Sequence, residues 1–251
     1  MKITISSDSL NGYGLNRIFA FAKDAGLDGV DIIIEKEKFD TQNADYIKSL
    51  IEEYGIPVVA VELSKKMNSE KTVMKYIELA DAIGAKTFVM YPPNLLDFKF
   101  IQWMKDSLKK VKRQVKCEVS LINPEPRTMF GILPEHAFIG LEGLKRYGGV
   151  TLDTANLYSL KHDLLDAYIT LRGSISHIFL SNVLRGIDHT PPQDGALPLE
   201  SLLAKLKRDN YDKAVSIRVR PRYLGVGNDE KVHASIVDIK DYINKYYSGG
   251  K

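Results

Sequence analysis

The chain has 251 residues, 44% of them hydrophobic, and its 35 Lys and Arg residues against 32 Asp and Glu residues give a formal net charge of +3. This length suits one barrel-sized domain or two small ones, and so slight a charge excess does not by itself indicate a nucleic-acid or membrane partner. The single cysteine, Cys117, rules out an intrachain disulfide, and we expect it to be buried in a strand. The sequence starts without the apolar segment of a signal peptide and has no run of about 18 apolar residues, so we expect a cytoplasmic protein.

Strand-like and helix-like segments alternate along the first half of the chain. Leu15, Ile18, Phe19 and Ala22 recur at helical spacing, whereas the segment from residue 29 to 34 is an almost continuous apolar run. The expected elements are a strand at 2–6, a helix at 15–25, a strand at 29–34, a helix at 44–54, a strand at 56–63, a helix at 69–83 and a strand at 86–91.

The alternation continues through the second half. The expected elements are a helix at 97–113, a strand at 115–123, a helix at 133–147, a strand at 150–153, a helix at 160–171, a strand at 175–182, a helix at 199–208, a strand at 214–219 and a helix at 232–246. Eight strands alternating with eight helices predict an α/β fold, a single (β/α)8 TIM barrel spanning residues 1–251. A doubly wound sheet is the alternative, but the segment 11–14 (NGYG) fits its phosphate-binding turn poorly.

The helix expected at 97–113 ends in four basic residues, Lys109, Lys110, Lys112 and Arg113. Cations are favoured near the C-terminus of a helix, so a solvated helix end is a simpler interpretation than a nucleic-acid patch.

The segment 149–156 (GVTLDTAN) leads from a short apolar strand directly into an acid, a hydroxyl and an amide. Side chains alternate along a strand, so Asp153 should face away from Val150 and Leu152. Because the carboxyl ends of barrel strands carry the chemistry in this fold, we expect Asp153 to belong to a site at the rim. A cap on the following helix is the structural alternative.

Further candidates lie near the ends of neighbouring strands. His177 fits either an interior histidine or a catalytic one, and His189 lies in a loop that also contains prolines and a glycine. Arg218, Arg220 and Arg222 recur at period two, and we expect Arg218 to point inward and the chain to have turned outward by Arg222.

Carboxylates and amides complete the candidate set. Glu125 lies between two prolines, which fits either a residue folded back into the site or a rigid surface loop. Asn156 and Asn182 follow strands and can bind a substrate through hydrogen bonds. The other available carboxylates are Asp31, Glu62 and Glu118.

Four motifs occur in the order found in one known family. They are residues 25–31 (AGLDGVD, against AGFDGVE), 149–156 (GVTLDTAN, against GLxLDTGH), 176–182 (SHIFLSN, against KHVHLKD) and the histidine of 187–189 followed by Asp194-Gly195. The sequence thus resembles the xylose isomerase-like TIM barrels, which include sugar and sugar-phosphate isomerases and epimerases and endonuclease IV. The resemblance covers nearly the whole chain and implies a sugar isomerase or epimerase of carbohydrate metabolism.

The resemblance also implies a divalent metal with four ligands, whose positions fall here on Ile122, Asp153, Phe179 and Arg218. Ile and Phe donate no lone pair, and a protonated Arg repels a cation. The metal site is therefore degenerate, and we expect no divalent metal or other cofactor, and an ion pair between Asp153 and Arg218 in its place.

Two functions remain open from the sequence. The first is a metal-independent isomerase or epimerase in which Asp153, His177 or Glu125 is the base and Arg218 stabilises an enediolate. The second is a non-catalytic barrel that binds a small anionic sugar-like molecule, with Asn156, Asn182, His189, Glu125 and Arg220 contacting the ligand in either case. An endonuclease IV-like enzyme needs more metal ligands than this chain offers, so nucleic acid is an unlikely partner; the sequence does not indicate the oligomeric state.

Overall fold

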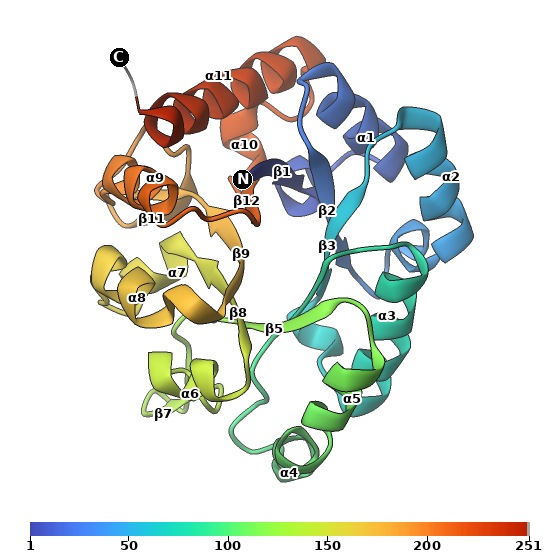
Figure 1. The fold of residues 1–251 in the computed structure, drawn as a ribbon, viewed down its shortest axis with the longest axis vertical. Coiled ribbons are helices and arrows are strands. Elements are labelled where there is room, and N and C mark those ends of the chain that lie inside the picture. Colours follow the sequence, from blue (N-terminus) through green and yellow to red (C-terminus); the bar gives the residue numbers. More distant parts are fainter. Residues whose placement is uncertain (250–251) are drawn as a thin grey trace.

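The computed structural model describes residues 1–249, which form a closed barrel of eight parallel strands surrounded by helices (Figure 1). Around the barrel the strands follow the order β1, β12, β9, β8, β5, β4, β3 and β2. They are β1 (Lys2–Ser6), β2 (Gly29–Ile34), β3 (Val58–Leu63), β4 (Thr87–Met90), β5 (Glu118–Ile122), β8 (Gly149–Asp153), β9 (Ile175–Leu180) and β12 (Ala214–Ile217). The predicted (β/α)8 fold is confirmed.

The helices lie outside this barrel (Figure 1). They are α1 (Leu15–Asp24), α2 (Ala44–Tyr54), α3 (Glu70–Ala82), α4 (Phe98–Asp106), α5 (Leu108–Gln114), α6 (Leu141–Arg146), α7 (Thr154–Ser159), α8 (Leu164–Leu171), α9 (Leu199–Arg208), α10 (Pro221–Leu224) and α11 (Asp229–Ser248). Short 3-10 turns occur at Ser7–Leu10, Phe39–Gln42, Lys65–Met67 and Arg172–Ser174.

The barrel interior is layered. A lower polar layer joins Asp31 to Thr4 and His177, with side-chain distances of 2.8 and 3.0 Å to the same carboxylate oxygen. Above it, Ile122 and Phe179 pack with Ala60 and Val89 as a small apolar cluster separate from the main core. The apolar layer therefore closes the barrel directly beneath its carboxyl-terminal rim.

The element boundaries differ from expectation at three helices. The helix expected at 97–113 is broken at Ser107 into α4 and α5, and the helix expected within 133–147 is the short α6. The helix expected at 160–171 starts later, as α8 at Leu164, and Asp153 caps an additional short helix, α7, directly after β8. In each case the apolar spacing indicated helix, but local capping and tertiary contacts decided where it ends.

Two hairpins at the rim were not expected from the sequence. Thr128–Met129 (β6) pairs with Leu133–Pro134 (β7), and Asn182–Leu184 (β10) pairs with Ile187–Thr190 (β11). The strand expected at 175–182 therefore ends at Leu180, and the strand expected at 214–219 ends at Ile217.

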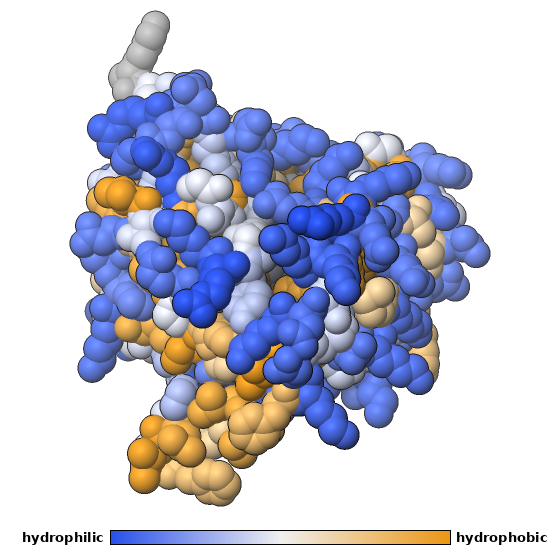
Figure 2. All heavy atoms as spheres, turned by 60° about the horizontal axis from the view of Figure 1, so that its bottom comes forward, coloured by the Kyte–Doolittle hydropathy of each residue, from blue (hydrophilic) through white to orange (hydrophobic). Residues whose placement is uncertain are grey.

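The β6–β7 hairpin exposes large apolar side chains. Phe130 and Ile132 are 87% and 83% exposed, and Figure 2 shows apolar side chains gathered on a projection from an otherwise largely hydrophilic face. Elsewhere the apolar residues are mostly buried between sheet and helices, including Cys117, whose burial raises its thiol pKa to about 12. Within residues 1–249 no helix combines the length and apolar content that crossing a membrane requires.

Candidate active site at the barrel rim

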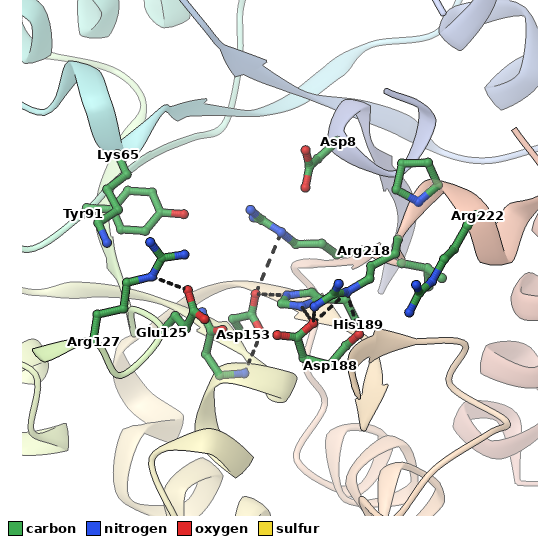
Figure 3. Close-up of a pocket in the computed structure, with 14 residues that line it drawn as sticks. Asp8, Lys65, Tyr91, Glu125, Arg127, Asp153, Asp188, His189, Arg218 and Arg222 are labelled. Carbon is green, nitrogen blue, oxygen red and sulfur yellow. Dashed lines mark hydrogen bonds and ion pairs between the residues drawn. The ribbon is translucent and has the colours of Figure 1, made fainter. Parts of the chain in front are cut away.

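A cavity of about 580 Å³ lies at the carboxyl-terminal rim of the barrel (Figure 3). Its lining is dominated by charged side chains from loops after several strands. The lining residues are Asp8, Lys65, Tyr91, Glu125, Arg127, Asp153, Asn156, Asp188, His189, Arg218, Val219, Arg220, Pro221 and Arg222. Asp153 thus lines a cavity at the rim, where the sequence predicted it to lie.

An ion pair between Glu62 and Arg218 crosses the floor of the cavity. Arg218, directly after β12, donates from Nη1 and Nη2 to the two carboxylate oxygens of Glu62 on β3, with Nη2–Oε1 at 3.2 Å. Tyr91 donates to the same carboxylate at 3.1 Å. Burial opposes the charge of Arg218, but the nearby Glu62 carboxylate outweighs it and raises the pKa of Arg218, so the guanidinium stays charged.

The Arg218 guanidinium also lies on an aromatic face. Its Cζ is 4.3 Å from the ring centroid of Phe179, which is fully buried on β9. A cation over an aromatic ring is stabilised by the ring quadrupole, and more so where water is excluded. Phe179 thus supports the arginine that follows the neighbouring strand.

Asp153 is held by His189. The Nε2 of His189 lies 3.2 Å from Asp153 Oδ2, whereas Arg218 Nε is 3.9 Å away, beyond hydrogen-bond distance. The expected Asp153–Arg218 pair is therefore only a longer-range contact, because Glu62 takes the guanidinium. Asp153 also caps α7 by accepting a hydrogen bond from the backbone N–H of Asn156. The residue therefore both lines the rim cavity and caps the following helix, the two alternatives expected from the sequence.

His189 lies between two carboxylates. Its Nδ1 is 3.4 Å from Asp188 Oδ1, on the opposite side of the ring from Asp153. Burial opposes its charge, but Asp153 and Asp188 outweigh burial and raise the pKa of His189 to about 9. The pKa of Asp153 is lowered, since His189 and Arg218 overcome the effect of its own burial. Near neutral pH the centre therefore pairs an imidazolium with a carboxylate.

The β10–β11 hairpin fixes His189 in place. His189 adopts a left-handed backbone with φ of 51°, which is uncommon for a residue with a side chain. The backbone N–H of Arg220 donates to the His189 carbonyl at 2.9 Å, and the Arg220 Nε donates to Asp188 at 2.8 Å. The hairpin is thereby tied to the segment after β12.

Cations surround the opening of the cavity. Lys65 pairs with Glu135 at 2.6 Å, and Arg127 pairs with Glu125 at 2.7 Å. Arg222 hydrogen-bonds the Tyr223 hydroxyl and pairs with no acid among the described residues. Arg222 lies on α10 and is exposed, as expected for a chain that has left the barrel strand by Pro221, and it borders the mouth of the cavity.

The side chains at the expected metal positions do not fit a divalent ion. Ile122 and Phe179 belong to the apolar cluster, and Arg218 is a charged guanidinium. Among residues 1–249 no group of three or more His, Cys, Asp or Glu side chains is arranged to hold a metal. The donor set that remains, Asp153 with His189, supplies fewer than the four ligands that the family resemblance implies.

Two of the expected site residues lie away from the cavity. His177 is fully buried two residues below Phe179 on β9 and hydrogen-bonds Asp31. Asn182 is buried at the start of β10, where its Oδ1 accepts from the backbone of Val183 and Leu197. The amide of Asn182 organises the loop after β11. A Cβ at Gly195 would lie only 2.2 Å from Asn182 Oδ1, so this position has no room for a side chain.

The other expected ligand-binding residues do line the cavity. Asn156 is 93% buried, and its Nδ2 donates to the Asn123 carbonyl at 3.0 Å. Glu125 and Arg220 reach the cavity from loops, and His189 reaches it from β11. Glu125 folds back toward the site while remaining partly exposed at the side chain.

Several lining residues were not singled out from the sequence. Asp8, Lys65, Arg127 and Asp188 are charged residues in short connecting segments between the main strands and helices, where charge is common. Glu62 had a usable signal, because a charged residue within an apolar strand that is buried on both faces must find a partner. Arg218 had been singled out as well, but nothing in the sequence indicated that these two residues, 156 positions apart, would pair.

Comparisons with known proteins agree with this architecture. The model of the family described as xylose isomerase-like TIM barrel matches residues 19–238. The structure of 3-keto-D-glucoside 4-epimerase from E. coli has a TM-score of 0.73 at 20% identity, covering 98% of this chain and 99% of that one. D-Psicose 3-epimerase from Clostridium cellulolyticum, solved with D-tagatose, has a TM-score of 0.73 at 14% identity over 98% and 99% of the two chains.

A zinc-containing relative has the same fold. The IOLI protein with a bound zinc atom has a TM-score of 0.72 at 16% identity, covering 99% of this chain and all of that one. No curated protein matches the sequence significantly. At these identities the structural likeness establishes the fold, and the family match over most of the chain establishes kinship. The chain belongs to the xylose isomerase-like TIM barrel family.

Proposed function

We propose that the rim cavity binds a small, hydroxyl-rich anion such as a sugar phosphate or sugar acid, and that the protein interconverts isomers or epimers of it without a divalent metal. The observation that carries this proposal is the position of Arg218. Its guanidinium lies where relatives are expected to have a metal ligand, faces the cavity, and is held by Glu62 and Phe179.

The cationic groups suit the charge that such a reaction develops. Removing a proton next to a carbonyl places negative charge on oxygen, and preorganised cations stabilise that charge. Arg218 has N–H groups beyond the two used by Glu62, and the His189 imidazolium can donate a proton or a hydrogen bond to the same oxygen. Asp153 is the carboxylate placed to accept the carbon-bound proton.

The anionic class of ligand is supported by the outer part of the cavity. Arg222 lacks an acidic partner among the described residues, so a phosphate or carboxylate of the ligand would supply its counter-charge. The acids that line the same cavity, such as Asp8, can accept hydrogen bonds from hydroxyl groups.

A non-catalytic binding protein is the second candidate, and one observation favours it. The lowered pKa of Asp153 and the raised pKa of His189 make the carboxylate a weak base and the imidazole a bound cation near neutral pH. Effective proton transfer is best served by a group with a pKa near the working pH.

The test uses a panel of sugar phosphates, sugar acids and neutral sugars in D2O. Thermal stabilisation by the anionic members reports binding, and loss of the signal of a carbon-bound proton in ¹H NMR reports proton abstraction. We expect the anions to give both the stabilisation and the proton exchange. In Asp153→Asn we expect the exchange to be lost while binding is retained. Binding without any exchange would support the non-catalytic protein, and no binding by any anion would refute both.

A further inference from the structure

A second concave site lies on the outer wall of the barrel. It is lined by Met104, Lys105, Leu108, Lys109, Lys112, Arg146, Tyr147 and Gly148, encloses about 520 Å³, and is called the α5–α6 groove below. Its residues come from α4, α5 and the end of α6. It shares no lining residue with the rim cavity. Gly148 immediately precedes β8, so the groove reaches toward the amino-terminal end of the strands, away from the rim.

The groove is lined by four cations and no acid. Lys105, Lys109 and Arg146 make no ion pair or side-chain hydrogen bond within residues 1–249. Some cations outside the groove do have an acidic partner, as in Lys213 with Glu118 or Lys205 with Asp209. Four like charges facing one cavity repel each other, and an anion in that cavity would relieve the repulsion.

Lys112 lies deepest among these cations. Its ammonium donates to the Tyr147 carbonyl at the end of α6. Burial lowers the pKa of Lys112, and Glu118, which is itself paired with Lys213, only partly opposes this. Gly148, with φ of +100°, makes room for the ammonium, because a Cβ there would lie 2.6 Å from Nζ. A partly desolvated cation without an acidic partner is a site that gains from a bound anion.

The floor of the groove is apolar. Met104 and Leu108 are 1% and 2% exposed, and the Tyr147 ring, which packs against Phe138, borders the same space. A cationic rim above an apolar floor suits a ligand with both an anionic group and a compact apolar body. The enclosed volume lies within the range typical of small-molecule sites.

We propose that the α5–α6 groove is a second ligand site, which binds a phosphate monoester with a small aromatic or apolar body. A phosphate offers several acceptor oxygens at once, so the lysines and Arg146 can each donate a charge-assisted hydrogen bond to it. The apolar part of the ligand covers Met104 and Leu108. This assignment does not depend on the chemistry proposed for the rim.

The experiment uses phenyl phosphate as the probe, with phenol and inorganic phosphate for comparison. Methyl-labelled methionine gives a reporter inside the groove, since Met104 forms its floor, and Met104→Leu assigns the signal. We expect phenyl phosphate to shift the Met104 signal saturably and to bind at least about tenfold more tightly than inorganic phosphate, whereas phenol leaves the signal unchanged.

The chain offers a matched control on α5, where Lys110 and Arg113 lie outside the groove lining. Lys109→Gln with Arg146→Gln removes two groove cations and should weaken the Met104 response at least about tenfold. Lys110→Gln with Arg113→Gln removes the same charge outside the groove lining and should leave the response unchanged, as should Arg222→Gln at the rim. Equal weakening in the control pair, or no saturable Met104 shift in the unmodified protein, would overturn the proposal.

Discussion

Glu62 and Arg218, 156 residues apart, form a two-point ion pair across the floor of the rim cavity. Both side chains are withdrawn from water, with exposures of 2% and 10%. A buried pair of this kind is costly to break from one side, because the remaining charge is left without its partner.

Arg218→Ala is therefore expected to lower the free energy of unfolding by about 3 to 5 kcal/mol, measured by urea denaturation. Glu62→Gln combined with Arg218→Met removes both charges and should recover most of this loss. Arg222→Met, which removes an exposed arginine from the same cavity, is the control and should change stability by less than about 0.5 kcal/mol. If the double variant is no more stable than Arg218→Ala, the charge imbalance is not the cause.

The raised pKa of His189 predicts a pH dependence of stability. In the folded protein the pKa is about 9, against an ordinary value of 6.5. The stabilisation is fully present below the ordinary value and is lost as the pH rises through 9. It amounts to at most about 3.5 kcal/mol, since each unit of pKa corresponds to about 1.4 kcal/mol.

The measurement is the free energy of unfolding from pH 6 to 10 for the native chain and for His189→Gln. We expect the difference between the two proteins to shrink across that interval, while the other titrating groups contribute equally to both. A difference that stays constant with pH would show that His189 is neutral in the folded protein.

The side chains at the expected metal positions predict that divalent ions do not change the stability of the protein. Mn²⁺, Zn²⁺ or EDTA should leave the melting temperature of the native chain unchanged. The combined variant Ile122→Glu, Phe179→His and Arg218→Glu supplies three new donors beside Asp153 and should acquire metal-dependent stabilisation. Elemental analysis that finds about one ion per native chain, lost in Asp153→Ala, would contradict this account.

His177 and His189 should differ in what their substitution changes. His177 lies in the polar layer of the barrel interior with Asp31, so His177→Leu should cost about 1 to 3 kcal/mol of stability without altering the affinity of the rim cavity for its ligand. His189→Gln should weaken ligand binding, because His189 lines the cavity. Isothermal titration with the strongest ligand from the sugar panel distinguishes the two; an equal loss of affinity in both variants would give His177 a direct role.

The fold was predictable because its signals are local and repeated. Continuous apolar runs such as residues 29–34 recur at regular distances, and each error in a boundary left the order of the elements intact. The two hairpins were missed because β6, β7 and β10 have only two or three residues each, too few to show a period.

The site was predictable only in part. Asp153 could be placed because a strand and a helix cap meet at one residue. The partner of Arg218 could not be chosen between Asp153 and Glu62, since sequence spacing does not tell which carboxylate lies closer across a closed barrel. The position of His189 between two acids depends on a hairpin that is itself held by Arg220, a contact between distant segments.

Barrel closure by β12 has a consequence for the order in which the molecule is assembled. β12 is the last strand in the chain and pairs with both β1 and β9, and Arg218, Arg220 and Arg222 all follow it. During synthesis the acids Glu62, Asp153 and Asp188 are therefore made before the arginines that neutralise two of them. A nascent chain ending before residue 214 already contains His189, the partner of Asp153, but lacks the arginines that pair with Glu62 and Asp188, so that part of the charge network forms only when the ring of strands is complete.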